Sequence, residues 1–202
     1  MFPLGSVLVP GMLLPLHVFE PRYRQMLAEV LDGDRCFGVV LIERGSEVGG
    51  GDVRSSVGTQ ARILDAARSD DGRFGVAALG EQRIRVESWL PDDPYPRAVV
   101  GAWPEADAEE GDSLADACEH AAGLIRSALA RRVELGDLAA PVSFEVLPEP
   151  CPASHQLSAL GPFGAADRQR LLSAPTVAER FDLLAALAAE DLELSELRLR
   201  QR

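Results

Sequence analysis

The first hundred residues consist of short apolar runs that glycine and proline interrupt at close intervals. Phe2–Val9 and Leu13–Phe19 are separated by the turn pair Pro10-Gly11, and Cys36–Ile42 is rich in β-branched residues. Runs of this length with turn residues between them are typical of β-strands. Strands that return at such short intervals favour a compact barrel or sandwich over a doubly wound parallel sheet.

The same pattern continues to residue 103, and a single helix interrupts it. The further segments with strand character are Val57–Ala67, Phe74–Leu79, Gln82–Trp89 and Arg97–Trp103. Asp70-Asp71-Gly72 predicts a hairpin turn, and Gly80-Glu81 predicts a break between two strands. After Glu20, apolar residues at helical spacing predict a helix that begins at Pro21 and ends at Gly33.

The composition changes at Pro104, where a helical half begins. The acidic stretch Glu105–Glu119 contains no basic residue and predicts a solvated linker that runs into a helix. Helical periodicity covers Leu114–Leu129, Ser154–Leu160, Ala165–Leu172 and Thr176–Ala189, and Thr176 and Glu179 have the spacing of a capping box. We therefore predict an α+β fold, with a β-rich subdomain over residues 1–104 and a helical subdomain over residues 105–202.

Four segments resemble blocks of one known family. They are FPLGSVLVPGMLLPLHVFEPRYRQML (Phe2–Leu27), VGTQARI (Val57–Ile63), ALGEQRIRVESW (Ala78–Trp89) and RQRLLSAPTVAERFDLLAALAAED (Arg168–Asp191). Together they resemble the N-terminal, substrate-binding domain of Lon-type ATP-dependent proteases, which also occurs as a stand-alone bacterial protein. The resemblance implies a PUA-like β pseudobarrel followed by a small helical bundle. It also implies protein or peptide clients and, as a further partner, a protease system.

The basic residues exclude several kinds of enzyme. All 20 are arginine, and the 202 residues contain no lysine. A P-loop, an imine-forming lysine and a Ser-Lys dyad are therefore impossible in this sequence, and no GxxxxGK[ST] occurs. The resemblance thus implies a non-catalytic binding module, without ATPase or peptidase activity and without a cofactor.

Charge and cysteine content restrict the partners and the compartment. The formal net charge of −12 opposes binding of nucleic acid, which depends on neutralising phosphates. Cys36, Cys118 and Cys151 form no CxxC pair and predict reduced thiols in a cytoplasmic protein. The apolar start MFPLGSVLVPGMLLPLHVF carries no basic residue and is broken by three prolines, so neither a signal peptide nor a membrane anchor is predicted.

The motif Phe19-Glu20-Pro21-Arg22-Tyr23 is interpreted as structural. Glu20 and Pro21 start the helix, with the Glu20 carboxylate near its positive end. The alternative is an active site in which Glu20 pairs with Arg22 or another arginine and Tyr23 offers its hydroxyl. Phe19 and Tyr23 are expected to pack under the sheet. His17, which alternates with apolar neighbours, is expected to be half-buried or at the surface.

Four residues are candidates for contact with a peptide. Trp89 and Trp103 end predicted strands, and Tyr95 lies in the proline-rich loop between them. Val48 lies in Gly45–Gly51, a glycine-rich segment that we interpret as a flexible hairpin tip at the edge of a binding groove. Aromatic side chains in such places can anchor a bound peptide.

Two pairs of cysteine and histidine are candidates for a metal site or for thiol catalysis, Cys118 with His120 and Cys151 with His155. Structural zinc sites need four ligands in recognisable spacings, which are absent here. Cys151 and His155 would share a face of a helix, but the prolines on both sides of Cys151 argue against a helix that begins early enough. No catalytic or metal-binding residue is predicted.

Three function hypotheses follow. The first is a protein-binding module that holds unfolded or tagged polypeptides, as an adaptor in protein quality control. The alternative is binding of a small molecule or RNA by the barrel. The third is a hydrolase, which would require Cys151, His155 or an acidic pair to converge in one pocket. The sequence leaves the client and the oligomeric state open.

Overall fold

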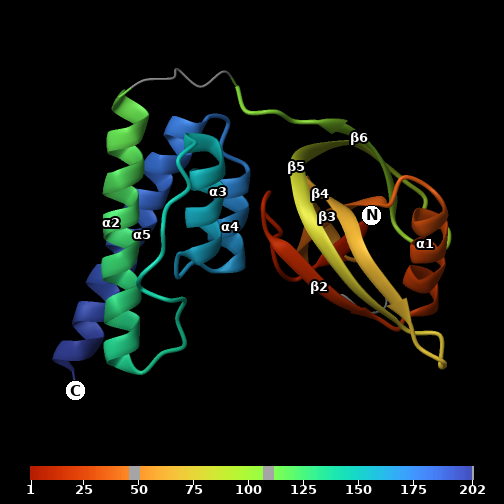
Figure 1. Cartoon of the computed structure of the whole chain (residues 1–202), viewed down its shortest axis with the longest axis horizontal. Helices are drawn as coiled ribbons and strands as arrows, with labels where there is room; N and C mark the ends of the chain where they lie inside the picture. Colours follow the sequence, from red (N-terminus) through yellow and green to blue (C-terminus); the bar gives the residue numbers. More distant parts are fainter. Residues whose placement is uncertain (46–50, 107–111, 202) are drawn as a thin grey trace. The chain divides into compact units, whose positions relative to one another are not determined.

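The computed structural model describes residues 1–45, 51–106 and 112–201. It separates into two compact units, Met1–Pro104 and Glu105–Arg202, which we call the β unit and the helical unit. The described part of the β unit contains β1 (Phe2–Leu4), β2 (Leu13–Val18), α1 (Pro21–Asp32), β3 (Cys36–Arg44), β4 (Val53–Arg68), β5 (Phe74–Leu90) and β6 (Arg97–Ala102) (Figure 1). The predicted α+β fold class is confirmed.

The strands form one curled sheet with the order β1-β3-β4-β5-β2, and β6 also pairs with β5 (Figure 1). β1 is parallel to β3, and the other pairs are antiparallel. β4 pairs along one edge of β5, while the first part of the other edge pairs with β2 and its last part pairs with β6. β1 and β2 are the two ends of the strand order.

The predicted break at Gly80-Glu81 is wrong, because β5 runs through it. Gln60 pairs with Gln82 and Ala61 pairs with Gly80, so Glu81 is the extra residue of a β-bulge. A Cβ atom on Gly80 would lie 2.6 Å from the Val9 carbonyl oxygen. Glycine is therefore needed at this position for a close approach of the backbone, and not for a turn.

The first strand is shorter than predicted, since β1 ends at Leu4. The residues after Leu4 leave β3 and contact β4 and β5 instead. The Thr59 hydroxyl donates to the Leu8 carbonyl oxygen at 2.6 Å, and the Gly11 amide donates to the Gly80 carbonyl oxygen at 2.8 Å. The Leu8 carbonyl therefore binds a side chain of β4 and does not continue the pairing of β1 with β3.

The core of the β unit lies between the concave sheet and α1. Tyr23, Met26 and Leu27 project from α1 into it, and all three are buried. The Tyr23 ring stacks on Phe2 of β1, with ring centroids 4.4 Å apart. The predicted hairpin turn before β5 is confirmed, and Gly72 adopts a φ of +79° there.

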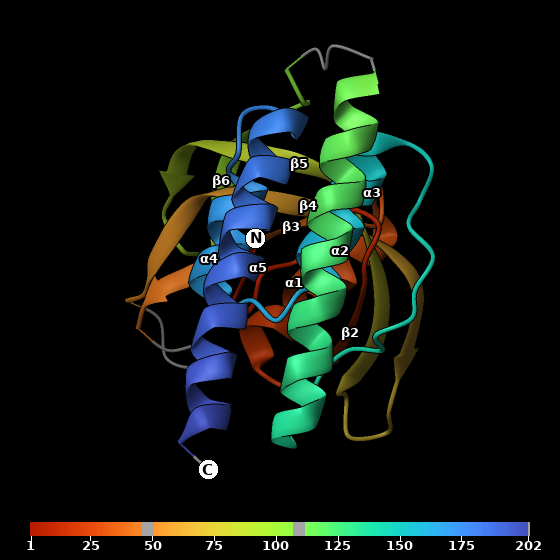
Figure 2. The ribbon, with the colours of Figure 1, turned by 90° about the vertical axis from the view of Figure 1, so that its left-hand side faces the viewer.

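The helical unit contains α2 (Asp112–Leu135), α3 (Pro150–Leu160), α4 (Ala165–Leu172) and α5 (Val177–Arg200). α2 and α5 lie side by side and run in the same direction (Figures 1 and 2). Thr176 is the N-cap of α5, because the Glu179 amide donates to the Thr176 hydroxyl at 3.1 Å, which is one of the two bonds of the predicted capping box. α5 extends well beyond the predicted Ala189, and Arg132 of α2 binds Asp191 in the added turns.

None of the three cysteines, all of which lie in the described residues, forms a disulfide. In the described ranges, every helix is too short or too polar to cross a bilayer.

Candidate functional site: a pocket between the ends of the sheet

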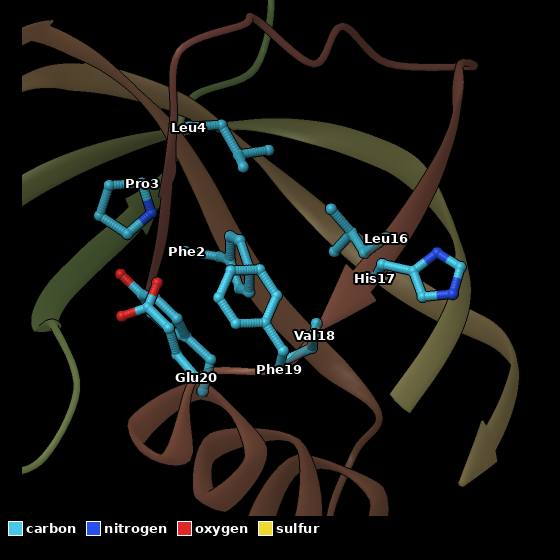
Figure 3. A pocket seen from close by; sticks show the side chains of 9 residues that line it. Phe2, Pro3, Leu4, Leu16, His17, Val18, Phe19 and Glu20 are labelled. Atoms are coloured by element: carbon cyan, nitrogen blue, oxygen red, sulfur yellow. The ribbon is translucent and has the colours of Figure 1, made fainter. Parts of the chain in front are cut away.

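A pocket of about 140 Å³ opens between β1 and β2 (Figure 3). We call it the seam pocket, because these strands end the sheet and do not pair with each other. Its lining consists of Phe2, Pro3 and Leu4 from β1, Leu16, His17 and Val18 from β2, and Phe19, Glu20 and Tyr23 at the start of α1. The two strands at opposite ends of the sheet order therefore meet, together with the start of α1, at one hollow.

The base of the seam pocket is apolar. Phe2, Leu4, Val18 and Tyr23 all belong to the buried core of the β unit. In Figure 3, the Phe19 ring lies at the centre of the view, while His17 extends away from it. His17 is exposed, as predicted.

The rim carries an apolar side chain that is open to solvent, because Phe19 lines the pocket and is 58% exposed. Met12 and Leu13 are exposed as well, but they lie at the start of β2 and do not line the pocket. The expectation that Phe19 packs under the sheet is wrong, whereas Tyr23 does so. Phe19 lies between the last residue of β2 and the first residue of α1, where the chain turns away from the core.

The polar groups at the pocket neutralise one another. Arg22 Nε donates to Glu20 Oε2 at 3.0 Å, and the Arg22 guanidinium lies 4.5 Å from the centre of the Tyr23 ring. Glu20 precedes Pro21 at the start of α1, but its carboxylate caps no backbone amide. Burial raises the pKa of Tyr23 to about 12, so its hydroxyl stays protonated at neutral pH.

Three of the four residues predicted for peptide contact, Trp89, Trp103 and Tyr95, lie elsewhere in the β unit. The Arg54 guanidinium lies 5.0 Å from the centre of the Trp89 ring, and Arg83 and Arg85 lie 4.2 and 4.1 Å from that of Trp103. Tyr95 is partly buried against the core, and its hydroxyl donates to Glu29 of α1. Val48 falls outside the described residues.

The helical unit has a hollow of its own, of about 370 Å³, between α2 and the segment before α3. Cys118, Glu119 and Arg126 line it together with alanines and prolines. Partial burial raises the pKa of the Cys118 thiol, which disfavours the reactive thiolate form.

A second group of side chains in the helical unit contains the donor types that bind metals. Glu105, Cys151 and His155 each direct a ligand atom to a common region in which these atoms lie within 4.8 Å of one another. The expectation that prolines delay this helix is wrong, because α3 begins at Pro150. Proline is compatible with the first helical positions, where its missing N–H has no partner in any case.

The seam pocket could not be recognised as a binding site from strand periodicity alone. Leu13, Leu14, Leu16, Val18 and Phe19 place apolar side chains on both faces of β2. A half-buried antiparallel strand is expected to be apolar on one face only. The signal in the sequence that could have indicated a binding site is the presence of apolar residues on the second face of β2.

Comparison with known proteins gives a consistent result. A family model described as the ATP-dependent protease La (LON) substrate-binding domain matches residues 1–189. A Lon protease of Cytophaga hutchinsonii is 26% identical over 198 residues, which cover 95% of this chain and 24% of the relative. A Lon protease of Desulfosudis oleivorans is 34% identical over 97 residues, which cover 46% of this chain and 12% of the relative. The chain thus spans no more than about a quarter of the length of these curated relatives.

A solved structure is similar over almost the entire chain. It is the crystal structure of a Lon N-terminal domain protein from Xanthomonas campestris, with 28% identity and a TM-score of 0.66. The similarity covers 92% of this chain and 95% of that one.

Proposed function

This chain belongs to the family of LON substrate-binding domains, whose model matches residues 1–189, and we propose that it binds apolar segments of unfolded polypeptides in the seam pocket. The observation that carries the proposal is a preformed apolar pocket with an exposed aromatic side chain, Phe19, in its lining. Such exposed apolar surface is typical of a site of interaction.

The size of the pocket favours a single apolar side chain as its occupant. A dry cavity of roughly 150 Å³ is enough to hold a benzene ring. The seam pocket, at about 140 Å³, matches one aromatic or branched aliphatic side chain. Sites for drug-sized ligands have volumes of roughly 300 Å³ or more. The pocket therefore supports an anchor residue of a peptide better than a whole small molecule.

The strand order supports an extended conformation for the bound segment. β1 and β2 are the ends of the sheet path, and β2 is paired along one side by β5. An extended peptide can add to the end of a sheet through backbone hydrogen bonds, with alternate side chains entering pockets. This mode recognises backbone and apolar character, so it suits clients of varied sequence.

Charge favours neutral or cationic clients. The chain has a formal net charge of −12, and the Glu20 carboxylate at the pocket is already bound by Arg22. An acidic surface attracts basic polypeptides and repels nucleic acid. We propose that the chain acts in the cytoplasm as an adaptor in protein quality control, and that it neither hydrolyses ATP nor cleaves its clients.

Fluorescence anisotropy with dye-labelled lysozyme that has been reduced and carboxamidomethylated, an unfolded cationic polypeptide, tests the proposal. Phe19→Ser is expected to weaken binding at least fivefold, which corresponds to about 1 kcal/mol. Phe19 is 58% exposed, so the change is not expected to unfold the β unit.

Leu64→Ser is the matched control, because Leu64 is 52% exposed on β4 and does not line the pocket. It is expected to bind the unfolded lysozyme as the unchanged protein does. Equal binding by Phe19→Ser and Leu64→Ser would refute the seam pocket as the site. Measurable ATP hydrolysis by the pure chain would refute the non-catalytic role.

A further inference from the structure

The side chains of Glu105, Cys151 and His155 converge in the helical unit. Cys151 and His155 lie one turn apart on α3, and Glu105 comes from the segment that precedes α2. Their donor atoms, a carboxylate oxygen, a thiol sulfur and an imidazole nitrogen, lie within 4.8 Å of one another. The peptide-binding role proposed above does not use this group, which lies in the other unit.

The start of α3 produces this arrangement. Because the helix begins at Pro150, residues 151 and 155 share one of its faces. Cys151 then lies in the first turn, where the helix dipole stabilises negative charge such as that of a thiolate. His155 is buried, and the Glu105 side chain is only 17% exposed. Two of the donors are therefore held on one helix, and the third comes from the segment before α2 with its side chain largely buried.

The distances fit a tetrahedral ion of the size of zinc. His155 Nε2 and Glu105 Oε1 are 3.2 Å apart. With zinc–nitrogen and zinc–oxygen bonds of about 2.0–2.2 Å, two ligand atoms of a tetrahedral site are separated by about 3.3–3.5 Å. Replacing the proton between His155 Nε2 and Glu105 Oε1 by an ion therefore requires these two atoms to move apart by only a few tenths of an ångström. The Cys151 sulfur lies within 4.8 Å and needs to approach by at most about 1 Å, which a side-chain rotation can supply.

Arg180 of α5 orients the carboxylate without occupying all of it. Its Nη2 donates to Glu105 Oε1 at 2.9 Å and to Oε2 at 2.8 Å. The guanidinium is itself fixed, because Nε donates to the Leu171 carbonyl oxygen and Nη1 donates to the Ser154 hydroxyl. A carboxylate has about four lone-pair positions, so Glu105 can accept from Arg180 and still bind an ion. Groups that orient a ligand in this way are a regular part of metal sites.

We propose that Glu105, Cys151 and His155 form a binding site for a zinc-class divalent cation, with water as the fourth ligand. Binding releases the thiol proton of Cys151 to solvent. The proton that His155 Nε2 shares with Glu105 moves to His155 Nδ1, so the imidazole stays neutral and binds the ion through Nε2. Since sulfur, nitrogen and oxygen donors occur together, zinc is favoured over calcium and magnesium, which take oxygen ligands. The ion would fasten residue 105 to α3 and so stabilise the helical unit.

Zinc titration of the tag-free full chain tests the site. The protein is first treated with a chelator and then titrated in competition with a chromophoric chelator. One equivalent of Zn²⁺ is expected to bind, and Cys151→Ser is expected to weaken binding more than 10-fold. Cobalt is expected to give a thiolate-to-metal charge-transfer band that Cys151→Ser abolishes. Bound Zn²⁺ is also expected to protect Cys151 from alkylation, as measured by peptide mass mapping.

Cys118→Ser and Cys36→Ser are the matched controls and are expected to keep the band and the affinity. Because His155 is buried, His155→Gln is used only if circular dichroism shows a folded protein, whereas Cys151→Ser changes one atom of a partly exposed side chain. Absence of stoichiometric zinc binding would overturn the proposal. So would an unchanged affinity in Cys151→Ser, or loss of the band in either control.

Discussion

Replacing Glu105 by glutamine is expected to destabilise the helical unit by about 3–5 kcal/mol in metal-free buffer, as measured for buried ion pairs that lose one partner. The guanidinium of Arg180 has no exposed surface, and Glu105 is the carboxylate that contacts it. Glutamine retains one oxygen acceptor but removes the negative charge. The buried cation then lacks its counter-charge, which is the costly situation.

The exposed pair Arg131–Glu134 provides a control within the same unit. Its side chains are 40% and 54% exposed. Glu134→Gln is therefore expected to change the free energy of unfolding by less than about 0.5 kcal/mol. Arg180→Met combined with Glu105→Gln is expected to cost less than the sum of the two single changes, because the double variant leaves no unpaired charge.

Chemical denaturation separates the two units in this test. Both tryptophans, Trp89 and Trp103, lie in the β unit, so fluorescence follows that unit. Far-ultraviolet circular dichroism follows mainly the helices. Glu105→Gln is expected to shift the circular dichroism transition and to leave the fluorescence transition in place. A cost for Glu105→Gln no larger than that for Glu134→Gln would refute the reasoning.

Two further predictions concern the β unit. Because burial raises the pKa of Tyr23 from 10.0 to about 12, the unfolded chain loses the hydroxyl proton at lower pH than the folded chain. About 3 kcal/mol of stability is therefore present below pH 10 and is lost as the pH rises towards 12. Urea denaturation across this pH range measures the loss, and Tyr23→Phe is expected to remove it, whereas the same pH dependence in Tyr23→Phe would contradict the assignment. Gly58→Ala would place a Cβ 2.2 Å from the Val39 carbonyl oxygen in the paired strand β3, and it is expected to cost at least about 2 kcal/mol in thermal or urea denaturation. Gly75→Ala meets nothing within 4 Å and is the control, so similar losses in both variants would show that the close approach is not the cause.

Most helices and strands could be predicted, because the residues that start and end them are neighbours in the sequence. Pro21 and Gly33 bound α1 as expected, and the capping pair Thr176 and Glu179 marks the start of α5. The errors occur where a distant segment decides the structure. Gly80 resembles a strand break, yet it accommodates the Val9 carbonyl oxygen inside a continuous strand. No pattern near residue 80 reveals that contact.

The two candidate sites were less accessible from the sequence, for different reasons. To recognise the seam pocket, one must know that β1 and β2 are the ends of the sheet. That depends on how all the strands pair and cannot be read from the sequence of either strand. The group around Cys151 requires the start of α3 and the position of Glu105, which lies 50 residues before His155. The prolines that argued against this helix are in its first turn, where they are tolerated.

Photo-cross-linking is the measurement that tests the central claim most directly. A short cationic peptide with one benzoyl-phenylalanine is bound to the full chain, irradiated, and the adducts are mapped by mass spectrometry. The account predicts adducts concentrated on Phe2–Leu4 and Leu16–Glu20, which line the seam pocket. Adducts on residues of the helical unit, or spread evenly over the chain, would contradict it.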